Sequence, residues 1–545
     1  MTAIPAPGRA HASFAPPPAY AHGGAPLPVS PHDERLTALV RPPDWRNPTP
    51  AARYDLVVIG AGTAGLVTAA GAAGLGAHVA LVERHRMGGD CLNTGCVPSK
   101  GVIAAGRAWH AARTGAARFG APVVAPDAAG ADGTGGAAFA LERMRAVRAD
   151  LAHLDGAERF RGLGVDVFFG TARFAGSDVA HVEAPGDTVA PLRFRRAVIA
   201  SGARAAIPPV PGLEDIGVLT NESVFDLAAP PARLLVVGAG PIGCELAQAF
   251  ARLGSEVTVL DAADRPLARE DADTAAVVRA AMERDGVRFL GGVRLTGATR
   301  AGDVRVLEGE QGARPLRVEG DAVLVAAGRR PNVEGLGLEA AGVAYDARRG
   351  VGVDARLRTT NRRVFAVGDV AALPTGGATQ FTHAADAQAR VAIQNALFFG
   401  RARADRLVIP RATYTSPELA TVGRTAAELT ADGVAFDAIT VPFAEVDRAV
   451  LGDEAEGFLR VLVRRGSDRL LGVTIVGADA GDLVAEAAVA MTNGLGLSAL
   501  GRTIHPYPTR AEVFRKAADR WRRGKLTPRA RSLLGRYLAV FRALT

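Results

Sequence analysis

Short apolar runs that end in glycine or in an acid recur along the chain and predict the strands of parallel sheets. They lie at residues 55–59, 78–82, 234–237 and 257–260. Val, Leu and Ile follow one another within each run, as in strands that are covered on both faces. Two later runs, 458–463 and 470–476, alternate in polarity and predict antiparallel strands. The pattern therefore predicts an α/β chain in which two parallel-sheet units precede an α+β segment.

Each pair of parallel strands carries the glycine fingerprint of a dinucleotide-binding βαβ unit. The residues are Gly60, Gly62, Gly65 and Glu83 in the first unit and Gly238, Gly240, Gly243 and Asp261 in the second. The spacing from first glycine to acid is the same, from 60 to 83 and from 238 to 261. Such glycines bring backbone close to a pyrophosphate at a helix N-terminus, and the acid binds ribose hydroxyls. A glycine-rich loop without a ligand is the alternative, but two matching copies favour two dinucleotide sites.

Three further strands are predicted to return to these units and to end at ligand-facing loops. The first, 196–200, leads into Ser201 and Gly202, and the second, 322–327, leads into Gly328. The third, 364–367, stops at Gly368-Asp369, where a buried ligand could lie. The predicted fold class is α/β, with two Rossmann-like domains and an α+β C-terminal domain.

Two of the three cysteines lie close together, shortly after the first fingerprint. Cys91 and Cys96 have four residues between them, including Gly95. A pair that can close in so cysteine-poor a chain indicates redox chemistry and a reducing, cytoplasmic location. A metal half-site is the alternative, but a closed zinc site takes four ligands. Cys244 is interpreted as a small buried hydrophobe, so no metal site is predicted.

The segment from Gly89-Asp90-Cys91 to Cys96-Val97-Pro98-Ser99-Lys100 resembles the FAD-dependent pyridine nucleotide–disulfide oxidoreductases, and the similarity runs over about residues 54–516. This is the family of dihydrolipoamide dehydrogenase, glutathione reductase and mercuric reductase. The resemblance implies FAD on the first fingerprint, NADH or NADPH on the second, and a homodimer. The implied FAD-binding residues are Gly60, Gly62, Gly65, Glu83, Lys100, Ser201, Gly202 and Asp369. The implied NAD(P)-binding residues are Gly238, Gly240, Gly243, Glu245, Asp261 and Gly328.

The resemblance also implies a role for each thiol. Cys91 would exchange with the substrate, and Cys96 would lie against the flavin as a thiolate. Lys100 would lie near the flavin ring with Glu245 as its ion-pair partner. A nearby helix N-terminus and a lysine supply the positive potential that a thiolate needs. Exchange at Cys91 would then connect the cofactors to an external substrate.

The C-terminal motif departs from the best-known members of the family, which carry a His immediately before a Pro-Thr pair. Here Tyr507 precedes Pro508-Thr509, while Glu512 keeps the place of the acid. Tyr, with an ordinary pKa near 10, is the poorer base at neutral pH. His505 either rotates into the base role or caps a turn. Mercuric reductases carry a Tyr in about this place, although this chain has no cysteine after Cys244 to relay a metal ion.

The net charge of +8 belongs to the C-terminal tail. Ten Lys or Arg against Asp519 give residues 515–545 a charge of +9, which leaves −1 for the rest. Apolar residues at helical spacing in this tail fit a helix packed across a dimer, which is favoured, or a helix lying on anionic lipid. No nucleic-acid partner is predicted.

The predicted boundaries divide the chain into six parts. They are a mostly disordered Pro/Ala-rich leader (1–50), a first part of the FAD domain (51–230), the NAD(P) domain (231–345), a second part of the FAD domain (346–405), a dimerisation domain (406–518) and a basic helical tail (519–545). The end of the leader, residues 41–45, is expected to pack locally through Trp45. A loose insertion at about 120–138 is expected before a helical run at 141–160.

The expected function is that of a homodimeric FAD-dependent oxidoreductase acting on a sulfur group with NAD(P). Electrons would pass from NAD(P)H through FAD and the Cys91–Cys96 disulfide to a small disulfide, thiol, metal or other electrophile. Asp261 favours NADH, because a carboxylate repels a 2′-phosphate, but Arg265 leaves NADPH open. One rival is a dihydrolipoamide dehydrogenase that oxidises thiols with NAD. The other is a membrane-docked or redox-sensing flavoprotein without rapid turnover.

Overall fold

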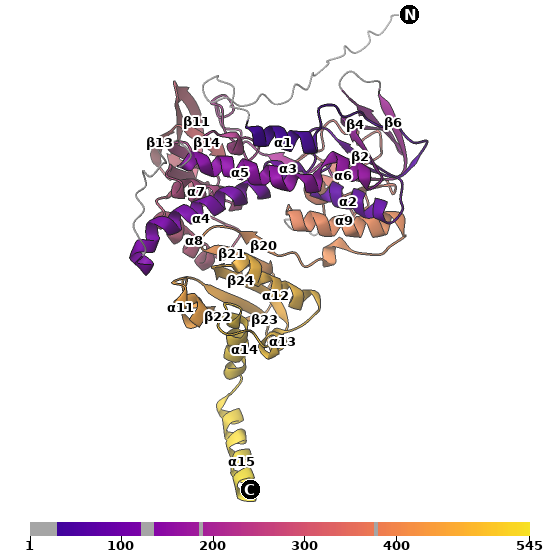
Figure 1. The fold of residues 1–545 in the computed structure, drawn as a ribbon. Coiled ribbons are helices and arrows are strands. Elements are labelled where there is room, and N and C mark those ends of the chain that lie inside the picture. Colours follow the sequence, from indigo (N-terminus) through magenta and orange to yellow (C-terminus); the bar gives the residue numbers. More distant parts are fainter. Residues whose placement is uncertain (1–29, 121–135, 185–188, 375–379) are drawn as a thin grey trace, which may run out of the picture.

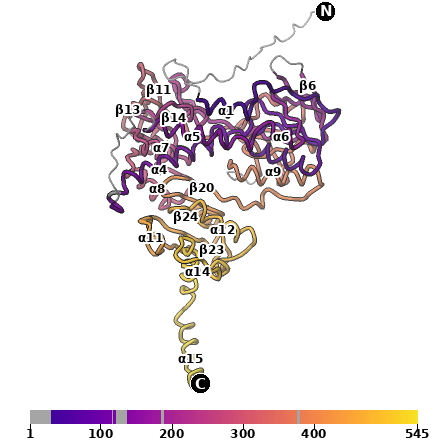
Figure 2. The backbone as a smooth tube through the Cα atoms, viewed as in Figure 1, coloured from indigo at the N-terminus to yellow at the C-terminus, as the bar shows by residue number. Residues whose placement is uncertain are grey.

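The structure is a computed structural model that describes residues 30–120, 136–184, 189–374 and 380–545. Two parallel sheets form the upper body in Figure 1, and an antiparallel C-terminal domain lies beneath them. The smoothed backbone of Figure 2 shows the same three parts and a last helix that leaves them. Among the described residues, no helix is both long and apolar enough to cross a membrane.

The first sheet is built around the first fingerprint. Its parallel part has the order β3-β2-β1-β6-β18, and β6 continues into an antiparallel extension through β5 and β4. The strands are β1 (Tyr54–Ile59), β2 (Val79–Glu83), β3 (Val165–Phe169), β4 (Thr171–Gly176), β5 (Val179–Glu183), β6 (Ala190–Ile199) and β18 (Val364–Ala366). Val58 lies opposite Leu81 on one side and Val198 on the other. Its covering helices include α2 (Thr63–Gly74) and α9 (Thr382–Leu397), which pack on each other.

The second sheet repeats this arrangement with the order β10-β9-β8-β14, all parallel. The strands are β8 (Arg233–Val237), β9 (Glu256–Leu260), β10 (Arg288–Leu290) and β14 (Ala322–Val325). Helices α7 (Pro241–Arg252) and α8 (Ala272–Arg284) accompany them, with an antiparallel sheet of β11 (Val293–Ala301), β12 (Val304–Gln311) and β13 (Arg314–Gly320). The long helix α4 (Cys96–Phe119) packs on α7 and on α5 (Ala137–Leu151).

The C-terminal domain is a five-stranded antiparallel sheet with helices on it. Its order is β20-β21-β24-β23-β22, from β20 (Arg411–Thr413), β21 (Glu418–Gly423), β22 (Phe436–Pro442), β23 (Phe458–Arg464) and β24 (Leu470–Gly477). Its helices are α10 (Ala426–Ala431), α11 (Asp447–Leu451), α12 (Ala480–Thr492), α13 (Leu497–Arg502) and α14 (Glu512–Gly524), followed by α15 (Pro528–Leu544). The predicted fold class, with two dinucleotide-binding units and an α+β C-terminal domain, is confirmed.

The predicted disorder of the leader is wrong for residues 30–40, whereas the local packing expected at Trp45 is found. Residues 30–50 include helix α1 (Pro31–Val40), in which Leu36 and Val40 are fully buried. Trp45 packs edge-on against Phe169, with 5.7 Å between ring centroids. These apolar groups find partners in the first sheet and in α5, which lie far away in the sequence. The rest of the leader, 1–29, lies outside the described residues, as does most of the predicted insertion, 121–135.

Candidate active site

The two fingerprints fold into the same tight turn. Gly60 leaves β1 with φ +101°, and a Cβ on Gly65 would lie 1.8 Å from the Gly60 carbonyl oxygen. In the second unit Gly238 has φ +106°, and a Cβ on Gly243 would lie 1.9 Å from its carbonyl oxygen. Only glycine satisfies both the left-handed turn and the close approach of the helix. The equal spacing in the sequence therefore produces equal geometry.

The two predicted ribose-binding acids also hold the backbone of their own turns. Glu83 accepts hydrogen bonds from the amides of Ala61 and His85, each at 2.7 Å. Asp261 makes the matching pair, to Ala239 at 2.5 Å and to Ala263 at 2.7 Å. Burial raises the pKa of Glu83 above its ordinary value, against the opposing effect of these amides. A carboxylate has room for further acceptor contacts, so ribose binding at both acids stays a prediction.

The helix N-termini beside these turns fit the phosphates of a dinucleotide. Neither Gly62 before α2 nor Gly240 before α7 has a side-chain cap among the described residues. A Cβ on Gly240 would meet no described atom within 4 Å, and one on Gly62 only the Cα of Gly89, at 3.7 Å. Free N–H groups at a helix N-terminus attract phosphate oxygens. The chain therefore offers two cradles of the kind that FAD and NAD(P)H need.

The redox segment lies directly on the first cradle. Cys91 is in the short helix α3 (Gly89–Asn93), and Cys96 begins α4. Gly89 has φ +55°, and a Cβ there would come within 2.5 Å of the Gly62 Cα. The backbone that carries the thiols thus contacts the backbone that faces the first pyrophosphate.

The two thiols are free, and their surroundings make them unequal. Cys91 is half-buried and Cys96 is exposed. A hydrogen bond from the Cys91 thiol lowers the pKa of Cys96 to about 6 despite partial burial, with further help from Thr382 and Lys100. The same bond and burial raise the pKa of Cys91. The Thr382 hydroxyl, at the start of α9, lies 3.3 Å from the Cys96 sulfur. Cys96 is therefore the thiol that loses its proton first.

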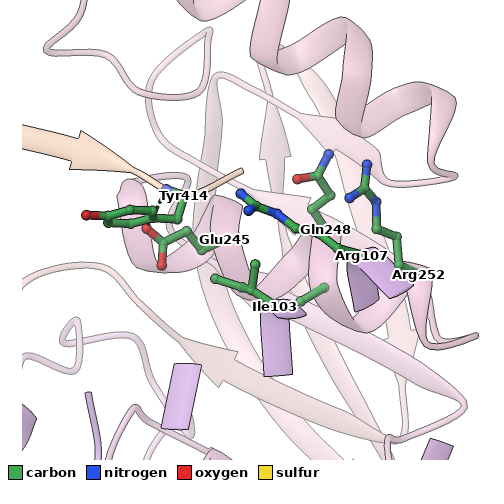
Figure 3. A pocket seen from close by; sticks show the side chains of 7 residues that line it. Ile103, Arg107, Glu245, Gln248, Arg252 and Tyr414 are labelled. Atoms are coloured by element: carbon green, nitrogen blue, oxygen red, sulfur yellow. Dashed lines mark hydrogen bonds between the residues drawn. The ribbon is translucent and has the colours of Figure 1, made fainter. Parts of the chain in front are cut away.

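The ion pair expected between Lys100 and Glu245 is confirmed. The Lys100 Nζ lies 2.7 Å from the Glu245 Oε2, and the Glu245 side chain is only 6% exposed. The other carboxylate oxygen accepts the Tyr414 amide at 2.8 Å, and Lys100 lies 4.5 Å from the centre of the Tyr414 ring. Figure 3 shows Glu245 and Tyr414 side by side in a small pocket that Ile103 of α4 also lines. Glu245 thus joins the two nucleotide-binding units and the C-terminal domain at one point.

Arg329, which the sequence reasoning did not single out, connects the redox segment to the predicted flavin-side acid. Its guanidinium lies 2.8 Å from Asp90 and 3.4 Å from Asp369, and its side chain is largely buried. Asn221 donates to the same Asp90 at 2.9 Å. Burial raises the pKa of Asp369, and the positive charge of Arg329 acts in the opposite direction. The only signal in the sequence was its position next to Gly328.

A second arginine, Arg148 of α5, holds the segment between the two cysteines. It donates to the Asn93 carbonyl at 2.8 Å and to Asp33 of α1 at 2.7 Å, with its side chain 3% exposed. Asn93 lies between the two cysteines. The N-terminal helix therefore reaches the redox segment through one buried arginine.

The remaining predicted cofactor residues lie where the two nucleotide-binding units meet. The Ser201 hydroxyl donates to the Asn332 carbonyl at 2.7 Å, and the Gly202 carbonyl accepts the Asn332 amide at 2.9 Å. The Gly328 carbonyl accepts the Ala206 amide at 3.0 Å. Strands β7 (Ala203–Ala205) and β15 (Arg329–Pro331) pair beside them. Their contact with cofactors stays a prediction, because these groups also connect the units.

The C-terminal motif does not reach the thiols within one chain. Tyr507 is 72% exposed, and its hydroxyl donates to Asp447 at 2.8 Å. The buried Glu512 pairs with Arg515. Among the described contacts of these residues, none involves Cys91 or Cys96.

The side chain of His505 is held by an acid of α12. It lies 2.9 Å from the Glu486 carboxylate with its side chain 6% exposed. This contact does not decide between a base and a turn cap, so both interpretations of His505 stay predictions. Cys244, in contrast, is fully buried as expected, and burial raises its pKa.

Two dinucleotide cradles with a thiol pair against the first define a flavoprotein of the disulfide-reductase class. The chain belongs to the pyridine nucleotide-disulphide oxidoreductase family, whose model matches residues 54–390 and whose dimerisation domain matches residues 409–518. It is an oxidoreductase of this family and uses FAD and NAD(P)H. The dimerisation domain supports a homodimer.

The similar proteins have different activities. A mercuric reductase of Streptomyces lividans is 34% identical over 473 residues, 86% of this chain and 96% of its own. A dihydrolipoyl dehydrogenase of Thermus scotoductus is 37% identical over 474 residues, 86% and 97% respectively. The Cu(II) complex of the HOCl-induced flavoprotein disulfide reductase RclA from Escherichia coli has a TM-score of 0.74 at 27% identity, covering 86% of this chain and 99% of that one.

Proposed function

We propose that the protein reduces a small external disulfide or a thiophilic electrophile with NAD(P)H, in the manner of the mercuric-reductase-like branch. The observation that carries the proposal is the unequal placement of the two thiols. Cys96 begins helix α4 and lies 3.3 Å from the Thr382 hydroxyl, which favours its thiolate, whereas Cys91 is half-buried beside it and ionises second. This is the order that a flavin-side thiolate and a substrate-side thiol require. FAD, when bound, supplies the transfer of an electron pair from NAD(P)H to the disulfide.

The residues of the chain then carry out two exchanges on a disulfide acceptor. The Cys91 thiol passes its proton to the Cys96 thiolate beside it. The Cys91 sulfur then attacks one acceptor sulfur, forms a mixed disulfide and releases the first thiolate, which takes the proton back from Cys96. The Cys96 thiolate attacks the Cys91 sulfur, closes the Cys91–Cys96 disulfide and releases the second. One NAD(P)H and one proton are consumed for two thiols formed. Lys100 favours the thiolate form of Cys96 for the second attack.

Tyr507 supports reduction of an acceptor over oxidation of dihydrolipoamide. The hydrogen bond to Asp447 raises the pKa of Tyr507 above its ordinary value near 10. A group that is neutral at pH 7 and already donating cannot take a proton from a substrate thiol. Thiol oxidation would need such a base for the substrate thiol, whereas in acceptor reduction the Cys91 proton passes to Cys96 and the last released thiolate needs only a proton donor.

A metal ion is less favoured than a disulfide as the electron acceptor. The chain has three cysteines, and Cys244 is buried away from solvent. A thiophilic cation would therefore have to meet Cys91 and Cys96 without other sulfur ligands. We infer that disulfides are the better acceptors.

We infer that NADH is the preferred donor. The carboxylate of Asp261 stands at the end of β9, where it repels a 2′-phosphate. The guanidinium of Arg265 donates to the carbonyls of Leu267 and Ala268, at 3.3 and 2.9 Å. These hydrogen bonds direct the guanidinium toward the backbone and leave Asp261 as the charged group at the end of β9. The cytoplasmic location stays a prediction.

An acceptor screen tests the proposal. The holoenzyme is assayed with NADH or NADPH against small disulfides, Hg(II) and Cu(II), and in the opposite direction with dihydrolipoamide and NAD. We expect disulfide reduction with NADH to be fastest, and Cys91→Ser or Cys96→Ser to lower it by roughly a hundredfold or more. Full activity in either variant, or a dominant dihydrolipoamide reaction, would contradict the proposal. The dihydrolipoyl dehydrogenase relatives make that reaction the second candidate.

A further inference from the structure

The last helix, α15, lies outside the family fold. The dimerisation domain ends at residue 518, whereas α15 spans Pro528–Leu544. Figures 1 and 2 show it projecting from the C-terminal domain, away from both nucleotide-binding units. The Thr527 side chain caps its start, and no residue in it is buried. A helix of this kind has a surface available for a partner.

One side of α15 is apolar and exposed. Its six largest apolar contributors are 47–81% exposed and are Leu533, Leu534, Tyr537, Leu538, Phe541 and Leu544. At about 100° per residue they occupy an arc of roughly 140°. The opposite side carries small residues, among them Ser532 and Ala539.

Arginines border this apolar arc on both sides. Arg529 and Arg536 fall on one edge, and Arg531 and Arg542 on the other, by the same helical spacing. After Asp519 the chain has no acidic residue. The surface is therefore apolar in the middle and cationic at the edges, which is complementary to an anionic partner with an apolar interior.

We propose that α15 docks on an anionic lipid surface. The apolar arc would enter the acyl boundary, and the bordering arginines would extend to the lipid phosphates. Nucleic acid fits less well, because its contacts need cations in the middle of the surface, not at its edges. A second α15 fits less well too, since the pair would bring eight arginines together without an acid. This departs from the sequence-based preference for a helix packed across the dimer.

Vesicle flotation of the full-length holoenzyme tests the proposal. The probes are vesicles of phosphatidylcholine alone and vesicles with about one quarter phosphatidylglycerol. We expect binding only to the anionic vesicles, weakened by high salt, and lost in a chain that ends at Gly524. NADH-dependent turnover without lipid should be the same in both chains.

A matched pair of charge variants separates the apolar arc from net charge. Leu534→Asp with Phe541→Asp places two acids in the arc, and Ser532→Asp with Ala539→Asp places two on the opposite side. We expect the first pair to lower bound protein at least about tenfold and the second much less. Equal loss in both pairs, equal binding to neutral vesicles, or binding of duplex DNA without vesicle binding would overturn the proposal. So would conversion of the dimer to a monomer on removal of α15.

Discussion

A hydrogen bond that runs in one direction makes the thiols of Cys91 and Cys96 unequal. It lowers the pKa of Cys96 to about 6, and Lys100 adds to the effect through its charge. Glu245 fixes that lysine at 2.7 Å. Residues of α3, α9 and α4 thus set the reactivity of the pair, and α7 of the other nucleotide-binding unit holds the lysine in place.

Two substitutions should move the pKa of Cys96 in opposite directions. Lys100→Met removes a positive charge and should raise it, and Glu245→Gln removes the counter-ion and should lower it. The alkylation rate of Cys96 in the reduced enzyme, followed against pH, measures both. In the unchanged enzyme this rate should fall as the pH drops below about 6, because the thiolate becomes protonated. A shift in the same direction in both variants would exclude an electrostatic role for the pair.

A substitution at Tyr507 should change which reaction is fast. Tyr507→His introduces a group with an ordinary pKa near 6.5, which can accept a proton at neutral pH. We expect dihydrolipoamide oxidation with NAD to rise about tenfold or more, since a positioned base contributes at least that much. Tyr507→Phe, the matched control without a titrating group, should show no such gain. A gain in both variants would show that the tyrosine acts only by blocking access.

At the scale of elements, the redox segment is held by other elements on two sides. Arg329, at the start of β15, contacts Asp90 before the first cysteine. Arg148 of α5 contacts the Asn93 carbonyl between the cysteines and is paired with Asp33 of α1. Helix α1 precedes residue 54, where the family match begins. An element outside the family match therefore reaches the redox segment.

Breaking the contact between α1 and α5 should loosen that segment. Asp33→Asn leaves the buried Arg148 without its counter-ion and should cost about 1–3 kcal/mol of unfolding free energy, since Asp33 is partly exposed. Denaturant unfolding of the holoenzyme measures the loss, and turnover should fall with it. Glu34→Gln, one position along on an exposed side of α1, is the control and should change neither. An unchanged midpoint in Asp33→Asn would show that α1 does not support the site.

At the scale of the whole molecule, the C-terminal domain places Tyr507 where it can act only across the dimer interface. Tyr507 is exposed, lies in the dimerisation domain and has no described contact with a thiol of its own chain. If it assists the thiol pair, it must do so in the partner subunit. We therefore expect each active site of the homodimer to contain residues from both chains.

Mixed dimers test this arrangement. Cys91→Ser and Tyr507→Phe are each expected to be impaired alone, but a mixed dimer would hold one site with both residues intact. An equal mixture, exchanged to equilibrium, should recover about a quarter of the wild-type disulfide-reductase activity. No recovery above the separate variants would place Tyr507 outside the partner's site.

The sequence alone determined the parts whose signals are local. The turns at Gly60 and Gly238 need backbone angles that glycine tolerates, and the strands before them are continuous apolar runs. The thiol pair of Cys91 and Cys96 could likewise be predicted from one short segment. Such features depend on neighbours in the chain, so pattern and spacing were enough to predict them.

Only the tertiary structure decided which distant groups meet these parts. Arg329 and Arg148 carry no local signal, because their function depends on Asp90 and Asn93 far away in the chain. Order in α1 depends in the same way on apolar and charged partners in α5 and the first sheet. The fold also places His505 against Glu486 of α12, a contact that no local pattern in the sequence indicates. Long-range pairs form only after the elements pack. The sequence of any one segment therefore does not predict them.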